Sequence, residues 1–236
     1  MSAPATDPTP PRREPAHALA RRLAGLYAVT PDLADTATLV GRVAAALDGG
    51  ATAVQYRNKS ADAALRREQA GALARVVAAR GALFIVTDDA TLAVAVGADG
   101  VHVGADDGDV AAARALVGPG RIVGVSCYDA FANAEAAVAA GADYVAFGSF
   151  YASPVKPDAR RADVALLARA RGLGVPVVAI GGITADNAAV LVRAGADAVA
   201  VISAVFGAPD VAAAARAIAH LFPVSPTTSR RSEQGS

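Results

Sequence analysis

The sequence predicts a single (β/α)8 TIM barrel of the α/β class, with disordered arms at both ends. Eight short apolar runs rich in β-branched residues recur between residues 23 and 222. Segments rich in Ala, Leu and Arg separate these runs and have helical spacing. A strand followed by a helix, repeated eight times in a domain of this size, is the pattern of a closed parallel barrel.

The predicted strands are apolar almost without interruption, which is typical of parallel strands buried on both faces. Segments such as AALRREQAGALARVVAAR and DNAAVLVRAG, between them, suit amphipathic helices. A doubly wound open sheet is the competing architecture, because periodicity does not report closure. The count of eight, and the lack of a Gly-x-Gly-x-x-Gly turn after the first run, favour the barrel. The strands are expected at 26–30, 53–57, 83–87, 100–104, 122–127, 144–148, 176–181 and 198–203.

The tripeptide Gly-Ala-Asp occurs three times, at 97–99, 141–143 and 195–197, each time between a helical segment and a strand. Glycine at a helix end can adopt the left-handed conformation that closes the helix. The three Asp residues therefore stand at strand starts, where we expect structural roles.

The two ends of the chain differ in composition from its middle. Residues 1–22 are Pro-rich and lack the apolar core of a secretory signal, and residues 223–236 are polar. We therefore expect a disordered arm at 1–22, a catalytic barrel at 23–222 and a disordered tail at 223–236.

The composition of the 236 residues restricts the function classes. A formal net charge of zero argues against a general nucleic-acid binder, whose phosphate-contacting face makes the domain basic. The apolar runs fall short of the ~18 residues of a membrane span. Cys127 is the single cysteine, which excludes an internal disulfide and suits a reducing, cytoplasmic location. The oligomeric state stays open, a homo-oligomer included.

In such barrels the reacting groups lie at the carboxyl ends of the strands. Cations follow the second strand and lie in the loop after the sixth, whereas carboxylates follow the third and fourth strands. Cys127 lacks a His partner at this rim and is expected to be a small packed residue; His102, inside a strand, is expected to line the barrel. The polar groups at these exits are Gln55, Arg57, Lys59, Thr87, Asp88, Asp89, Asp106, Asp107, Ser126, Ser149, Ser153 and Lys156.

The paired carboxylates at 88–89 and 106–107 admit two interpretations. An Asp after a strand commonly caps the helix that follows. Alternatively, one carboxylate from each of two neighbouring strand ends can share a Mg²⁺ ion, with substrate phosphates and water completing its ligands. Arg57, Lys59 and Lys156 could then hold the remaining phosphate oxygens. The combination at one rim favours a site for metal and pyrophosphate.

The exits of strands seven and eight, GGIT and VISAV, suggest a second anion site. GGIT allows close backbone approach, and VISAV precedes a helix whose free N–H groups can bind a phosphate. Asp186 and Asn187 begin the next helix and are expected to cap it. A phosphate site after these two strands is common among barrels, so it indicates a phosphorylated substrate and little more.

Seven ordered motifs resemble those of the thiamine-phosphate synthase family, over about residues 25–206. They are QYRNK at 55–59, TDD at 87–89, GVHVGADD at 100–107, GVS at 124–126, GSFYASPVK at 148–156, AIGGIT at 179–184 and VAVIS at 199–203. The resemblance implies a transferase that joins 4-amino-5-hydroxymethyl-2-methylpyrimidine diphosphate to 4-methyl-5-(2-phosphoethyl)thiazole and releases pyrophosphate.

The resemblance also implies site residues. Asp88 and Asp107 would ligate Mg²⁺, and Arg57, Lys59, Ser126 and Lys156 would be catalytic. The thiazole phosphate would lie against Ser153, Val155, Gly182, Ile202 and Ser203. The pyrimidine diphosphate would lie against Gln55, Tyr56, Arg57, Asn58, Lys59, Thr87, Ser126 and Lys156.

Four positions depart from the usual family pattern. Thr87 replaces Asn and still offers a hydroxyl, and Ala105 replaces Gln. Ser153 and Val155 stand where two Thr residues are frequent. Because Val155 has no hydroxyl, any phosphate contact there is expected through the backbone.

Three rival functions are weighed against the synthase. A thiazole tautomerase, a homologous barrel, has no diphosphate to hold, so QYRNK with Asp88 and Asp107 speaks against it. A more distant rival is a phosphate-binding barrel isomerase or aldolase; an aldolase would need a Schiff-base lysine inside a strand, whereas Lys59 and Lys156 lie beyond strand ends. The third is a thiamine-precursor binding protein without turnover, which an assay of pyrophosphate release would identify.

Overall fold

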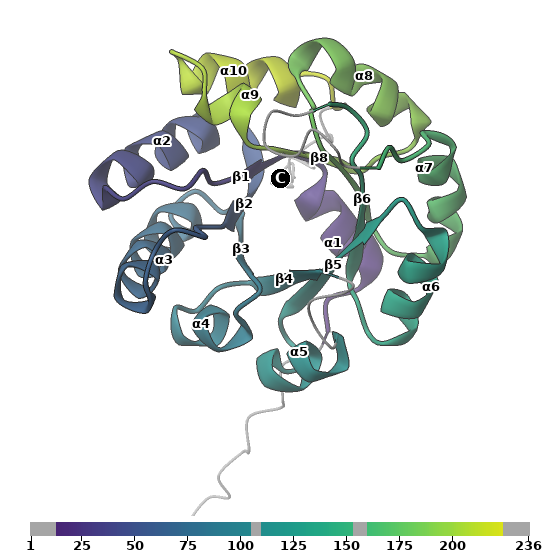
Figure 1. Cartoon of the computed structure of the whole chain (residues 1–236), viewed down its shortest axis with the longest axis horizontal. Helices are drawn as coiled ribbons and strands as arrows, with labels where there is room; N and C mark the ends of the chain where they lie inside the picture. Colours follow the sequence, from purple (N-terminus) through teal and green to yellow (C-terminus); the bar gives the residue numbers. More distant parts are fainter. Residues whose placement is uncertain (1–12, 105–109, 153–159, 224–236) are drawn as a thin grey trace, which may run out of the picture.

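The chain forms a closed barrel of eight parallel strands in sequence order, β1 to β8, with β8 pairing back to β1 (Figure 1). The structure, a computed structural model, describes residues 13–104, 110–152 and 160–223. Every neighbouring pair of strands is parallel, which confirms the predicted TIM barrel and rules out the open sheet.

The strand boundaries agree with the apolar runs to within two residues at each end. The third and fourth strands have the predicted bounds. The strands are β1 Gly25–Val29, β2 Ala51–Tyr56, β3 Leu83–Thr87, β4 Gly100–Gly104, β5 Ile122–Tyr128, β6 Tyr144–Phe147, β7 Val177–Ile180 and β8 Ala198–Val201.

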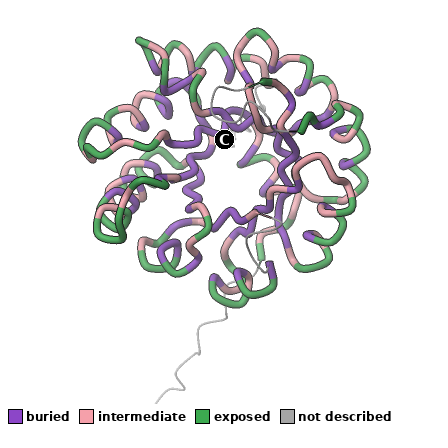
Figure 2. Tube along the Cα trace, in the orientation of Figure 1, coloured by how far each residue is buried: buried purple, intermediate pink, exposed green. Residues whose placement is uncertain are grey.

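Helices surround the barrel and bury one face each against it, so exposed residues lie on the outer rim of the tube in Figure 2. None of the helices in the described part of the chain is long and apolar enough to cross a membrane. The helices are α1 Ala16–Leu23, α2 Thr36–Asp48, α3 Ala63–Ala78, α4 Ala90–Ala95, α5 Val110–Val117, α6 Phe131–Ala139, α7 Ala165–Ala170, the 3₁₀ turn η1 Arg171–Leu173, α8 Ala185–Ala194, α9 Ser203–Phe206 and α10 Val211–Ala219.

The three Gly-Ala-Asp tripeptides fix the register of neighbouring strands. The carboxylate of Asp99 accepts the N–H of Phe84 at 2.8 Å, that of Asp143 accepts from Val123 at 2.7 Å, and that of Asp197 accepts from Val177 at 2.8 Å. Each of these acceptors lies one strand further along than its donor. The preceding glycines all have positive φ. The predicted structural role of the tripeptide is confirmed.

The prediction that residues 1–22 form a disordered arm is wrong for their second half, because α1 lies there. Leu19 and Leu23 are fully buried against barrel-lining side chains such as Tyr27 and Ile122. In Figure 1, α1 lies inside the ring of strands. The helix therefore closes the amino-terminal end of the barrel, and the folded domain begins before residue 23.

Leu23→Ala is expected to lower the free energy of unfolding by roughly 2–5 kcal/mol, because it leaves a cavity between α1 and the barrel lining. Leu116→Ala is the matched control: the same atoms are removed where the side chain is 62% exposed, and the change should stay within about 0.5 kcal/mol. Urea unfolding of both variants measures the difference. Equal stabilities would show that α1 does not close the barrel.

Candidate active site

A cavity of about 260 Å³ opens at the carboxyl ends of β2 and β3. It brings together Arg57 and Lys59 from one exit with Thr87, Asp88 and Asp89 from the next, as the sequence predicted for neighbouring strands. Arg66 of α3 adds a third cation that strand-exit reasoning missed. A larger cavity of about 490 Å³ lies at the opposite end, between α1 and the starts of β4 to β6, and its lining includes none of the predicted site residues.

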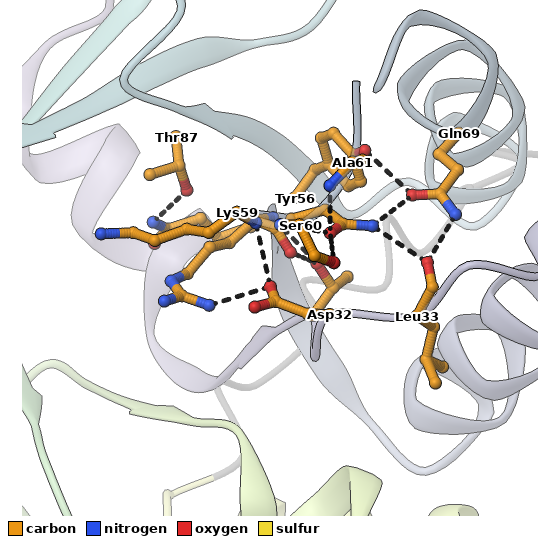
Figure 3. Close-up of polar contacts among 12 residues, drawn as sticks. Asp32, Leu33, Tyr56, Lys59, Ser60, Ala61, Gln69 and Thr87 are labelled. Carbon is orange, nitrogen blue, oxygen red and sulfur yellow. Dashed lines mark hydrogen bonds and ion pairs between the residues drawn. The ribbon is translucent and has the colours of Figure 1, made fainter. Parts of the chain in front are cut away.

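The β2 exit is held in place by two residues of the β1 exit that sequence reasoning also missed. Asp32 accepts from Arg57 Nη1 at 3.0 Å and from the backbone N–H of Lys59 at 3.1 Å (Figure 3). The buried Thr30 hydroxyl accepts the Arg57 N–H at 2.8 Å and donates to the Arg57 carbonyl at 2.9 Å. A signal existed, since Thr30 is the last residue of the first predicted strand and Asp32 lies two positions beyond it, at this rim.

The side chains of Tyr56 and Asn58 point into the protein, although the resemblance implied that both residues bind substrate. The Tyr56 hydroxyl donates to Gln69 Oε1 at 2.9 Å, and Asn58 Nδ2 donates to the same oxygen at 3.0 Å (Figure 3). Asn58 Oδ1 accepts from the N–H groups of Ser60 and Ala61. These two side chains therefore shape the loop, and both residues also line the cavity.

Gln55 of β2 and Thr87 of β3 form one polar unit across neighbouring strands. Gln55 is 7% exposed, and its Nε2 donates to Thr87 Oγ1 at 2.7 Å. A hydroxyl can accept and donate at once. The Thr87 hydroxyl thus bonds to its neighbouring strand while lying at the cavity wall.

The two carboxylates after β3 are arranged differently. Asp89 is the N-cap of α4, where its side chain accepts the Leu92 N–H at 2.8 Å. Asp88 is exposed in the cavity wall and has a φ of +58°, with its N–H donating to the His102 carbonyl at 2.8 Å. Both carboxylates line the cavity, but helix capping already explains Asp89, and Asp88 is the more exposed of the two.

At the β5 exit, Ser126 bonds to a buried imidazole. His102 Nε2 lies 2.8 Å from Ser126 Oγ, and His102 Nδ1 lies 2.8 Å from the Tyr144 hydroxyl. Burial lowers the pKa of His102 to about 4. The adjacent Cys127 is fully buried, and burial raises its pKa to about 12. His102 and Cys127 therefore take the packed positions that the sequence predicted for them.

The free energy of unfolding is expected to decrease as pH falls from 6.5 to about 4. Over this range His102 becomes protonated in the unfolded chain but stays neutral in the folded barrel. The free energy of unfolding therefore falls by on the order of 3 kcal/mol. Carboxylates titrate close to the same pH range, so wild type is compared with two variants by urea unfolding. His102→Gln should flatten the pH dependence of the free energy of unfolding, whereas His220→Gln, at an exposed histidine, is the control and should leave it unchanged. Parallel pH profiles for all three proteins would exclude this role for His102.

The exits of β7 and β8 offer backbone donors. Gly182 has a φ of +65°, and a Cβ there would lie 2.4 Å from the Ala152 carbonyl oxygen. Within the described residues, no acceptor is found for the N–H groups of Gly182, Ile202 and Ser203. At the start of α8, Asn187 caps through its amide, whose Oδ1 accepts the Thr184 N–H at 2.9 Å. These exits can bind an oxyanion through main-chain groups.

Five residues of the predicted site and rim lie outside the described residues, as does Ala105: they are Asp106, Asp107, Ser153, Val155 and Lys156. Their predicted roles stay predictions. Within the described ranges, no three His, Cys, Asp or Glu side chains group together as a metal site.

Comparison with known proteins gives consistent matches. A family model described as Thiamine monophosphate synthase matches residues 26–205. A thiamine-phosphate synthase from Chromobacterium violaceum is 57% identical over 201 residues, which cover 85% of this chain and 97% of the relative. One from Thiobacillus denitrificans is 57% identical over 203 residues, with 86% and 96% covered. The family match runs from β1 into α9, and so includes every strand exit described above.

Solved structures agree with this match. A thiamine phosphate pyrophosphorylase from Pyrococcus furiosus is 37% identical with a TM-score of 0.77, covering 86% of this chain and 96% of that one. A 3-hexulose-6-phosphate synthase is 22% identical with a TM-score of 0.63 over 84% of this chain and 100% of that one, and shares the fold alone.

Proposed function

Because the chain belongs to the thiamine-phosphate synthase family and is a transferase with that family's activity, we propose that the cavity between β2 and β3 binds the pyrimidine diphosphate. One observation carries this assignment: Arg57, Lys59 and Asp88 line the same cavity. The two cations suit the oxygens of a diphosphate, and the carboxylate suits a divalent cation bound to it.

The reaction requires the protein to bind both substrates and to stabilise the charge on the leaving group. The bond from the benzylic-type carbon to the diphosphate can ionise, since the electron-rich aminopyrimidine stabilises the resulting cation. Arg57 and Lys59 would stabilise the charge that grows on the departing pyrophosphate. The thiazole nitrogen then only has to be positioned for attack. Lys156 would assist the same leaving group, and this role stays a prediction.

Asp32 prepares Arg57 for this task. Its carboxylate bonds to the Arg57 guanidinium and to the Lys59 N–H, so both residues leave the strand in a fixed direction. The Arg57 side chain is only 23% exposed. Part of the free-energy cost of removing its guanidinium from water is therefore met on folding, before a substrate binds. We propose that Asp32 is a positioning residue for the two cations.

The donor chemistry of the cavity fits Mg²⁺, which prefers oxygen ligands and is commonly held by one or two carboxylates together with substrate phosphates and water. Asp88 presents such a carboxylate beside the cations, and Asp107 would be the second. When bound, Mg²⁺ would neutralise charge on the leaving pyrophosphate. Asp89 is already engaged as a helix cap, so it is not proposed as a ligand.

We further propose that the thiazole phosphate binds at the β7 and β8 exits. The N–H groups of Gly182, Ile202 and Ser203 support this assignment, since they find no acceptor within the described residues. Gly182 meets the backbone of residues 151 and 152 closely enough that only glycine fits. Ser153 and Val155 would complete this site. Two phosphorylated substrates would thus enter one rim from different strand exits.

Turnover tests the proposal. The protein, Mg²⁺ and both substrates are incubated together and pyrophosphate release is measured, with each substrate and the metal omitted in turn. Release that requires both substrates is expected. A thiazole tautomerase would instead isomerise a thiazole phosphate without the pyrimidine, and a precursor-binding protein would bind both ligands and release no pyrophosphate. A single buried thiol suits the cytoplasmic location that we propose.

A further inference from the structure

Four side chains form a continuous polar path through the interior of the barrel. The Tyr27 hydroxyl of β1 lies 2.9 Å from the Tyr144 hydroxyl of β6. That hydroxyl lies 2.8 Å from Nδ1 of His102 in β4, whose Nε2 lies 2.8 Å from Ser126 Oγ in β5. Tyr27 and Tyr144 are fully buried, whereas Ser126 is partly exposed. The path therefore runs from the core outwards to a residue at the predicted substrate rim.

The barrel makes room for this path at one glycine. β5 lies between β4 and β6, and Gly124 pairs with His102 on one side and with Tyr144 on the other. A Cβ at Gly124 would lie 1.9 Å from Cζ of the Tyr144 ring. Tyr144 can therefore cross over Gly124 and stack against the His102 ring, with centroids 5.6 Å apart.

The direction of the hydrogen bonds follows from the Tyr27 hydroxyl, where the path ends in the core. Within the described residues, Tyr144 is the sole hydrogen-bond partner of the Tyr27 hydroxyl. If Tyr27 donates to Tyr144, then Tyr144 donates to Nδ1, and the proton of His102 lies on Nε2 and points to Ser126. The reverse direction leaves the Tyr27 proton buried without an acceptor, which costs about 1–3 kcal/mol.

The favoured direction has a consequence at the rim. Ser126 Oγ accepts from Nε2–H, so its own proton is free to be donated to another acceptor. A substrate with ring nitrogens and phosphate oxygens supplies acceptors. The imidazole is neutral at pH 7, since burial lowers the pKa of His102 to about 4. The Nε2–H tautomer of the His102 ring therefore makes the Ser126 hydroxyl a donor.

We propose that His102 and Tyr144 are positioning residues that hold the Ser126 hydroxyl as a hydrogen-bond donor to the pyrimidine diphosphate. The proposal rests on the proposed function only in the identity of the acceptor. The tautomer itself is a property of the protein without substrate.

The first measurement is therefore independent of turnover. ¹⁵N NMR of the imidazole nitrogens identifies the tautomer, and the chain has only three His residues to assign. We expect His102 to carry its proton on Nε2 in the wild type and in Tyr27→Phe, because Tyr144 still donates to Nδ1 there. Tyr144→Phe, the matched change at an equally buried site, should mix the tautomers. A proton on Nδ1 in the wild type would overturn the proposal.

The second measurement is kinetic. His102→Asn keeps an amide near Tyr144 but is too short to reach Ser126, and we expect kcat to fall about tenfold. His102→Gln can place an N–H near the position of Nε2 and should recover much of this loss. Tyr27→Phe should stay within about twofold of the wild type, as expected for a residue that does not touch Nδ1.

Ser126→Ala decides whether His102 acts through the hydroxyl. In that background His102→Asn should cost little more, because the group it positions is already gone. An unchanged tenfold effect would overturn the proposal and assign His102 a different role. If wild-type protein released no pyrophosphate, the proposed function would fail, whereas the tautomer would still be decided by NMR.

Discussion

Asp88→Asn is expected to lower the rate of pyrophosphate release about a hundredfold, the equivalent of ~2.7 kcal/mol in the barrier. Asp88 lines the cavity beside Arg57 and Lys59, and the substitution removes its charge while keeping its shape. Raised Mg²⁺ should restore part of the activity, since a weaker site fills at higher metal concentration.

Asp89→Asn is the matched control for this prediction. The same change is made one residue away, at a side chain that caps α4 by accepting the Leu92 N–H. Asn caps helices about as well as Asp does, so stability and turnover should both stay near the wild type. If Asp89→Asn lowered activity and responded to Mg²⁺ while Asp88→Asn did not, the assignment within this pair would be reversed.

Gly182→Ala is expected to raise the KM for the thiazole phosphate at least about tenfold, with a smaller change in the KM for the pyrimidine diphosphate. The added Cβ would lie 2.4 Å from the Ala152 carbonyl oxygen and 2.6 Å from that of Tyr151, at a φ of +65°. Left-handed backbone alone costs a residue other than glycine about 1–2 kcal/mol. The β7 exit would have to move, and its N–H donors with it.

Gly172→Ala provides the comparison. A Cβ there would meet nothing within 4 Å, and its φ lies outside the left-handed range, so both KM values should be retained. Steady-state kinetics with each substrate varied in turn measures the two effects. A uniform loss of kcat in Gly182→Ala, with both KM values unchanged, would remove the β7 exit from the thiazole phosphate site.

The barrel and the position of its rim were predictable from the sequence because the signals are local. Each strand is a short and mostly apolar run, and the strands pair in sequence order. Once the strands are parallel and consecutive, their carboxyl ends must share one rim. Arg57 and Asp88 could therefore be placed together although 31 positions, 88 minus 57, separate them.

The helix α1 was not predictable in the same way. Its eight residues, AHALARRL, follow a Pro-rich segment and mix Ala and Leu with His and two Arg, so their composition did not separate them from the arm. Leu19 and Leu23 gain their burial from the open end of a barrel formed by later parts of the chain. A short helix of this kind is stabilised by packing rather than by its own propensity.

The sequence by itself determined the strand order, the tripeptides that set strand register, and the rim where cations meet carboxylates. Only the tertiary structure decided which side chains near that rim are engaged by partners within the protein. Tyr56 turns away towards Gln69, Asp89 caps a helix, and His102 meets a tyrosine 42 positions distant. Local patterns report burial and period, whereas the partner of a polar side chain depends on which strands become neighbours and on the space that a residue such as Gly124 leaves between them.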